Sequence, residues 1–83
     1  MKYKFSTGFR APRGAKAEVV AAEIYEIQQR DNEITPPALV EAARDKQSPL
    51  HPFFEWNDGE AAEQYRLYQA RTLIRAIVVQ RTD

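Results

Sequence analysis

The sequence lacks cysteine altogether and contains only one histidine, His51, and one methionine. Without cysteine the chain has no disulfide, no thiolate metal site and no cysteine nucleophile. A single histidine does not supply the usual ligands of a transition-metal site, and no string of acidic residues has the spacing of a calcium loop. We therefore expect neither a metal ion nor any other cofactor.

Long hydrophobic runs are missing as well. No apolar stretch approaches the roughly 20 residues that a membrane span needs, and the sequence shows no signal-peptide pattern. We therefore expect a cytoplasmic protein that does not contact a membrane. With 83 residues, of which 43% are hydrophobic, the chain has the composition of one small folded domain. A domain of this size is marginally stable unless a partner adds to its stability.

Charge is arranged in blocks, although the formal net charge is zero. Residues 1–16 carry five cations and no acid, residues 17–65 carry eleven acids against three cations, and residues 66–83 carry four arginines against one acid. The charges indicate a basic arm over residues 1–14, in which we also expect an edge strand, and we expect residues 15–83 to form a single helical domain. Such an arm either binds a polyanion or folds back onto its own acidic body, and the pattern leaves both open.

Hydrophobic periodicity predicts a mostly α-helical fold of four helices, one of them very short. The first helix covers roughly residues 15–30 and ends at the turn formers Asp31-Asn32-Glu33. The second begins at Thr35-Pro36, because threonine supplies a capping oxygen and proline tolerates the first helical position, and it ends near Lys46. The inward faces of these helices have helical spacing: Val20, Ile24 and Ile27 in the first, and Leu39, Val40 and Ala43 in the second.

A second capped start, Ser48-Pro49, predicts a short helix directly after the second one. Pro52 stands at its fourth position, so this helix has room for only a turn or two. Two short capped helices joined by a tight turn resemble a helix-turn-helix. We expect most aromatic side chains in and after this segment to be buried in the core: Phe53, Phe54, Trp56 and Tyr65.

The last helix is expected from about residue 58 to residue 77, with Asn57 and Glu60 as a capping box at its start. Arg66 interrupts the apolar stripe of this helix. An arginine there either reaches out to solvent or pairs with a carboxylate, and we expect a structural ion pair. The candidate carboxylates lie on segments that should pack against the helix, and the pair we favour is Arg66 with Glu55, ahead of Glu41 and Asp45.

The two ends of the chain predict a small β-ribbon. Tyr3 and Phe5 alternate with Lys4, as in a strand with one buried face. The stretch from Ile77 to Gln80 loses the helical period and favours a second strand. Because a two-stranded ribbon is weak alone, we expect the helices to support it.

No arrangement of residues predicts catalysis. Ser48 and His51 are three residues apart, which suggests a nucleophile and its base, but Ser48 is better explained as a helix cap. No third residue and no oxyanion hole accompany them. The three glycines match neither a phosphate-binding loop nor a dinucleotide fingerprint. We therefore expect no catalytic residue, no enzymatic activity and no small-molecule substrate.

Binding of another macromolecule is the remaining class of function. Tyr68, Arg71 and Arg75 lie on the outer face of the last helix, and an aromatic residue beside arginines is typical of a protein-interface hot spot. We expect these residues to bind a protein partner or a second copy of the chain. The alternative is DNA held mainly by its phosphates, because the second helix of the motif is apolar and offers little to a base. The residues for that alternative are Lys2, Lys4, Arg10, Arg13, Lys16, Arg71 and Arg75, with His51 as the one side chain for a base edge.

Part of the chain resembles a known group of proteins. Over residues 34–77 the similarity is carried by four short runs: Ser48-Pro49-Leu50-His51, Phe54-Glu55-Trp56, Tyr65-Arg66 and Gln69-Ala70-Arg71. This pattern resembles the N-terminal module of small uncharacterised proteins of phages and prophages. The resemblance implies a phage or mobile-element origin and supplies no activity. The sequence as a whole thus predicts a non-enzymatic interaction module of phage type, with its partner and oligomeric state left open.

Overall fold

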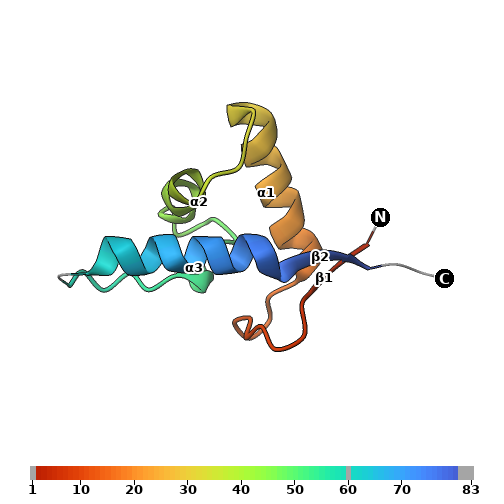
Figure 1. The fold of residues 1–83 in the computed structure, drawn as a ribbon, viewed down its shortest axis with the longest axis horizontal. Coiled ribbons are helices and arrows are strands. Elements are labelled where there is room, and N and C mark those ends of the chain that lie inside the picture. Colours follow the sequence, from red (N-terminus) through yellow and green to blue (C-terminus); the bar gives the residue numbers. More distant parts are fainter. Residues whose placement is uncertain (1, 60, 81–83) are drawn as a thin grey trace.

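The computed structural model describes residues 2–59 and 61–80, and in this part of the chain it contains three α-helices and a two-stranded antiparallel sheet. Figure 1 shows α3 along the length of the molecule, with α2 beside it and α1 rising near its C-terminal end. The predicted mostly α fold is confirmed, whereas the prediction of four helices is wrong. In chain order the elements are β1 (Lys2–Phe5), α1 (Ala17–Asp31), α2 (Pro36–Ala43), the 3₁₀ turn η1 (His51–Phe53), α3 (Ala62–Ala76) and β2 (Ile77–Gln80).

The turn between α1 and α2 forms where the sequence predicts it. Helix α1 ends at Asp31, and Asn32 adopts a left-handed φ of 66°, which asparagine tolerates better than most residues. Thr35 then caps α2, because its hydroxyl oxygen accepts a hydrogen bond from the backbone N–H of Ala38 at 3.2 Å. With Pro36 at the first helical position, the predicted start of α2 is confirmed.

The predicted third helix is only the single turn η1. The Ser48 hydroxyl accepts a hydrogen bond from the N–H of Leu50 at 3.1 Å, inside a turn, and caps no α-helix. Pro52 has no N–H to donate to the carbonyl four residues earlier, and its ring would clash there, so an α-helix cannot continue through it. The helix-turn-helix interpretation is therefore corrected, since three residues do not make a second helix that could lie in a DNA groove.

Helix α3 begins later than predicted, at Ala62 instead of near residue 58. Ala61 occupies the N-cap position, and no side chain makes a capping hydrogen bond there, so Asn57 is not the cap. Asp58, expected in the first helical turn, instead forms an ion pair with Arg66 from an irregular segment. Glu60, the other half of the predicted capping box, lies outside the described residues.

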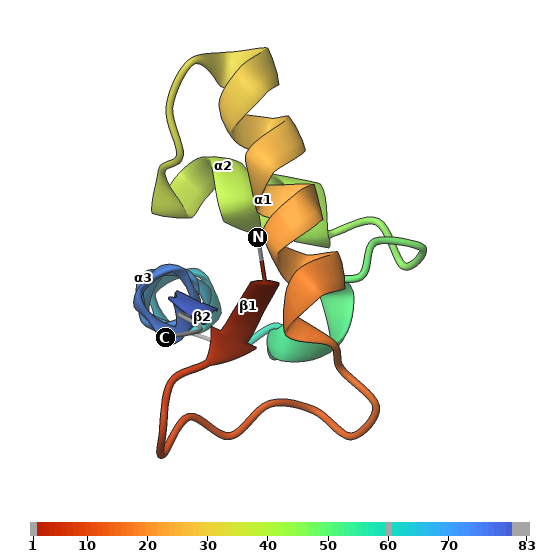
Figure 2. The ribbon, with the colours of Figure 1, turned by 90° about the vertical axis from the view of Figure 1, so that its right-hand side faces the viewer.

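Strands β1 and β2 pair antiparallel and join the two ends of the described chain, as predicted. Tyr3 lies opposite Val79 in this register. Beyond β1, the Ser6 N–H donates a hydrogen bond of 2.7 Å to the carbonyl of Ala76, so the contact extends to the end of α3. Figure 2 shows the ribbon between α1 and α3, where it closes one side of the molecule.

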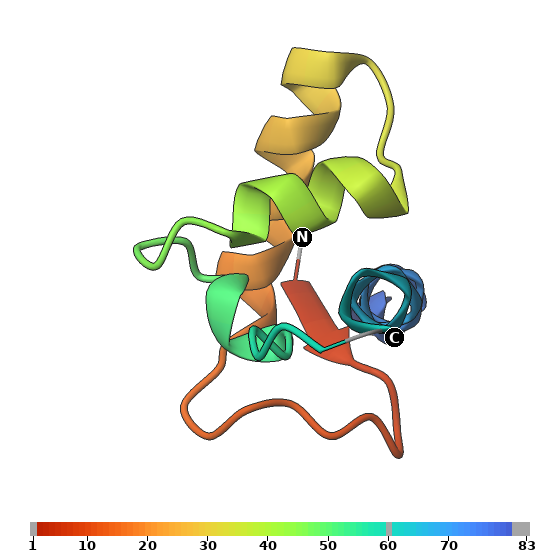
Figure 3. The ribbon, with the colours of Figure 1, turned by 90° about the vertical axis from the view of Figure 1, so that its left-hand side faces the viewer.

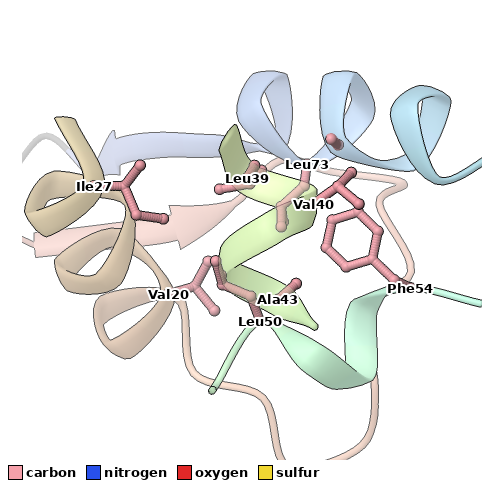
Figure 4. Close-up of a cluster of buried hydrophobic side chains, with 9 residues drawn as sticks. Val20, Ile27, Leu39, Val40, Ala43, Leu50, Phe54 and Leu73 are labelled. Carbon is pink, nitrogen blue, oxygen red and sulfur yellow. The ribbon is translucent and has the colours of Figure 1, made fainter. Parts of the chain in front are cut away.

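The hydrophobic core lies where the three helices meet the segment around η1 (Figure 4). Helix α2 is its central element, because Leu39, Val40 and Ala43 have no exposed surface. The surrounding segments each contribute side chains that are at most 7% exposed: Val20 and Ile27 from α1, Leu50 and Phe54 from either side of η1, and Ala70 and Leu73 from α3.

Aromatic contacts hold the N-terminal segment against this body. The Phe9 ring stacks on Phe5 and on Phe53, with centroids 5.5 and 6.2 Å apart, and Gly8 at a φ of 89° makes the turn before it. Figure 3 shows the loop that follows β1 passing below η1. Within residues 2–59 and 61–80, no basic residue of this segment forms an ion pair. The segment therefore folds back through apolar packing and leaves its cations exposed to solvent.

Candidate interaction surface

Arg66 is the one buried charged residue in the described part of the chain, at 4% exposed. Its Nη1 donates a hydrogen bond of 3.0 Å to the backbone carbonyl of Glu55, not to the Glu55 carboxylate. Its carboxylate partners are Asp58, 3.1 Å from Nη2, and Glu63, 3.2 Å from Nε. The predicted Arg66–Glu55 ion pair is therefore corrected: Glu55 accepts through its main chain, while its carboxylate accepts from the N–H of Asn57.

The indole ring of Trp56 covers this arginine. The guanidinium carbon of Arg66 lies 5.2 Å from the centroid of the ring, within cation–π range. His51 stacks on the same indole at 4.8 Å with the planes 4° apart, and the indole N–H donates to the His51 carbonyl at 2.8 Å. The His51 Nδ1 lies 2.8 Å from the carbonyl oxygen of Ala43. The histidine is thus fixed between α2 and Trp56, with its Nδ1 already engaged by the backbone of α2.

A chain of alternating charges connects this cluster to α2. Arg44 contacts Glu41 at 2.7 Å and Glu63 at 2.9 Å, so Glu63 bridges the two arginines. The hydrogen bonds to Glu41 and then to Glu63 raise the pKa of Arg44 above its ordinary value, because they favour the charged guanidinium. Both arginines of this charge network, Arg44 and Arg66, are matched by carboxylates. The network therefore supports the fold and offers little to a ligand.

A groove on the outer side of α3 is lined by arginines that, within the described residues, form no ion pair. It consists of two adjoining hollows of about 700 and 360 Å³, between the N-terminal loop and the helix. Its wall is formed by Phe9 and Arg10 of the loop, and its floor by residues of α3. We call this surface the basic groove and define it by the residues that the argument uses: Phe9, Arg10, Tyr65, Tyr68, Thr72 and Arg75.

The floor of the basic groove carries two stacked tyrosines. Tyr65 and Tyr68 are one helical turn apart, with ring centroids at 6.2 Å and planes 18° apart. They are 50% and 58% exposed, respectively. The expectation that Tyr65 is buried is therefore wrong, whereas Tyr68 is exposed as predicted. Tyrosine presents a large rigid apolar surface with a polar end, which makes it a frequent anchor of protein interfaces.

The cations at the basic groove have no carboxylate of their own. Arg10 and Arg75 line it, and Arg71 is exposed on α3, three residues from Tyr68 and four from Arg75. Among the residues that the structure describes, none of these three arginines makes an ion pair. An incoming acidic group would therefore meet three charges that no internal partner neutralises.

The structure brings together only some of the cations predicted for DNA. Arg10 and Arg75 share the basic groove, with Arg71 beside it. Lys2 and Lys4 are exposed on β1, on the face of the strand opposite to Tyr3 and Phe5. Arg13 and Lys16 are exposed between β1 and α1 and line none of the described hollows.

Sequence reasoning missed the wall of the groove and one of its tyrosines. The wall exists because Phe9 packs between two distant rings, and no periodicity in the loop predicts that contact. Tyr65 could have been found from its spacing, because tyrosines three residues apart on a helix lie side by side.

Residues 2–59 and 61–80 also lack two other features that would point to a function. They contain no helix whose length and apolar character would suffice to cross a membrane, and no cluster of three or more potential metal-binding side chains. Comparison of the chain with protein-family models, with curated proteins and with solved structures finds no match.

Proposed function

We propose that the chain is a non-enzymatic interaction module that binds a protein through the basic groove. The observation that carries the proposal is the contrast between arginines. Arg44 and Arg66 are matched by carboxylates, whereas Arg10, Arg71 and Arg75 surround exposed tyrosines without any partner in the described chain.

The groove determines the chemistry of the partner. Its stacked tyrosines and Phe9 favour an apolar or aromatic anchor, and its arginines favour carboxylates on either side of that anchor. The partner is therefore an acidic protein segment that carries at least one large apolar side chain. A phage or mobile-element origin stays a prediction from the sequence pattern, and the proposal does not depend on it.

Selection from a random peptide display library tests this proposal. We expect the wild-type protein to enrich acidic peptides with aromatic or aliphatic anchors. For a synthetic copy of an enriched peptide, Tyr68→Ser and Arg75→Gln should each weaken binding on the order of tenfold or more, because each removes an anchor of the groove. Lys46→Gln is the matched control, since Lys46 is an exposed cation outside the groove and should not affect binding. Peptides without acidic residues, or peptides that bind all variants equally, would refute the proposal.

DNA binding through phosphates is the alternative, and the cations without partners on the N-terminal segment favour it. It lacks a recognition helix, because η1 has three residues and His51 is held by Trp56 and Ala43. Fluorescence anisotropy with a labelled duplex distinguishes the two proposals. A DNA-binding role requires affinity at low salt that falls steeply as salt rises, whereas we expect no change in anisotropy at any salt concentration.

A further inference from the structure

Helix α1 has a second apolar face that the fold leaves uncovered. An amphipathic helix ordinarily presents polar residues to solvent, but Val19 and Tyr25 of α1 are 48% and 60% exposed. Ala22 lies between them and is also exposed. Glu18 and Glu26 stand on the same side of the helix, because residues three, four and seven apart share a face. We call Glu18, Val19, Ala22, Tyr25 and Glu26 the acidic face.

The acidic face is hollowed where it meets the ribbon. A depression of about 340 Å³ lies between α1 and β1, with Tyr3 on one side and Tyr25 on the other. Glu18 and Glu26 are at its edge. In residues 2–59 and 61–80 neither of these two carboxylates forms an ion pair. The acidic face therefore has the properties deduced for the partner of the basic groove: aromatic anchors flanked by unneutralised acids.

The two surfaces of one molecule cannot reach each other. Thr72 lines the basic groove, whereas Ile74 lines a separate hollow of about 200 Å³ that it shares with Tyr25. Residues two positions apart on an α-helix are about 200° apart around its axis. Figure 1 likewise shows α1 on one side of α3 and the N-terminal loop on the other. Each surface must find its complement on another molecule.

We infer that the occupant of the basic groove is the acidic face of a second copy of this chain. This inference rests on the proposed function and names its partner. Tyr25 of one copy enters the groove beside Tyr65 and Tyr68 of the next, with Glu18 and Glu26 against the groove arginines. The interface is heterologous, because it joins two different surfaces, and such contacts produce rings or open chains of copies. The zero net charge fits this assembly, since each copy contributes one basic and one acidic surface.

Sedimentation velocity over a range of protein concentrations tests this inference with two variants. The groove variant carries Tyr68→Ser and Arg75→Gln, and the face variant carries Tyr25→Ser and Glu26→Gln, all at exposed positions. At low salt we expect the average mass of the wild type to rise with protein concentration. At high salt the average mass at the same protein concentration should be lower, because salt screens the charges of the interface. Each variant alone should stay at the monomer mass. An equimolar mixture should form dimers of one copy of each, because the mixture contains one intact groove and one intact face.

The control proteins are Lys46→Gln and Glu33→Gln, which remove one exposed charge of each sign outside both surfaces and should associate like the wild type. A wild type that stays monomeric, or a mixture of variants that does not associate, would overturn the inference. If acidic peptides still bind the groove in that case, the proposed function survives and only the identity of the partner is wrong. If no peptide binds either, both proposals fail.

Discussion

Arg66 and Arg75 lie on the same helix, about two and a half turns apart, and their surroundings are opposite. Arg66 is 4% exposed, covered by Trp56, and bonded to two carboxylates and a backbone carbonyl. Arg75 is exposed at the edge of the basic groove, with no ion pair in the described chain. The same side chain is part of the fold in one place and open to a partner in the other.

The difference shows that the neighbours of a charge, more than its position in the sequence, determine its use. A buried guanidinium is tolerated only where hydrogen bonds replace those that it loses to water, and the Arg66 cluster supplies them. An exposed guanidinium keeps its water and gains little from the fold. We therefore expect substitutions around Arg66 to change stability and substitutions around the basic groove to change binding.

The largest expected effect belongs to Arg66→Ala. It removes the packing against Trp56 and a charge-assisted, partly buried hydrogen bond to the backbone, so the free energy of unfolding should fall by about 2–3 kcal/mol. Its carboxylate partners are themselves half or more exposed, so they do not become stranded charges. Urea denaturation measures the loss, with Arg75→Ala as the matched control at less than about 0.5 kcal/mol. Equal stabilities of the two variants would refute the comparison.

Gly8→Ala comes next, because it acts where the groove depends on the fold. The φ of 89° at Gly8 disfavours any side chain, and the substitution should lower the free energy of unfolding by about 1–2 kcal/mol. Thermal unfolding measures this change. The same turn positions Phe9, so peptide binding should weaken as well. A variant of full stability would show that the loop is not held in this conformation.

Trp56→Phe should have a smaller effect on stability. The phenyl ring keeps most of the apolar contact but loses the indole N–H that donates to the His51 carbonyl, at a cost of about 1 kcal/mol. Chemical denaturation with a far-ultraviolet signal is suitable, because the variant lacks the only tryptophan. Peptide affinity of the groove should be unchanged. A loss of affinity would mean that Trp56 belongs to the binding surface.

Arg44→Gln should have the smallest effect. Arg44 is 40% exposed, and solvent screens its contacts with Glu41 and Glu63, so the free energy of unfolding should change by less than about 0.5 kcal/mol. Denaturation at low salt measures it under the conditions that favour ion pairs most. A change as large as that of Arg66→Ala would show that the alternating chain acts as one unit.

The features that local chemistry determines could be predicted from the sequence. Thr35 caps α2 because its hydroxyl oxygen accepts a hydrogen bond from the N–H three residues further on, and the strands pair because both favour β structure at the chain ends. Arg66 could be selected because it interrupts an apolar stripe. Its partner Glu63, three residues earlier on the same helix, also follows from helical spacing. Glu55 and Asp58 do not, since they lie on an irregular segment whose path no periodicity describes.

For the same reason, only the floor of the basic groove can be predicted from the sequence. Helical spacing places Tyr68, Arg71 and Arg75 on one face of α3, so the floor follows from the sequence. The wall depends on long-range packing of Phe9 against rings from β1 and η1, and such contacts arise only in the folded chain. The sequence does not mark the exposed apolar face of α1, because the buried residues alone account for the helical spacing of this segment.

The most direct test of the central claim is a dilution series followed by two-dimensional amide NMR of the wild-type protein. If exposed surfaces bind while the Arg66 cluster only supports the fold, two groups of signals should shift together with concentration. One comes from the basic groove, including Tyr68 and Arg75, and the other from the acidic face, including Tyr25. The indole signal of Trp56 should stay in place. Signals that do not move at any concentration, or a Trp56 signal that moves with them, would contradict the account.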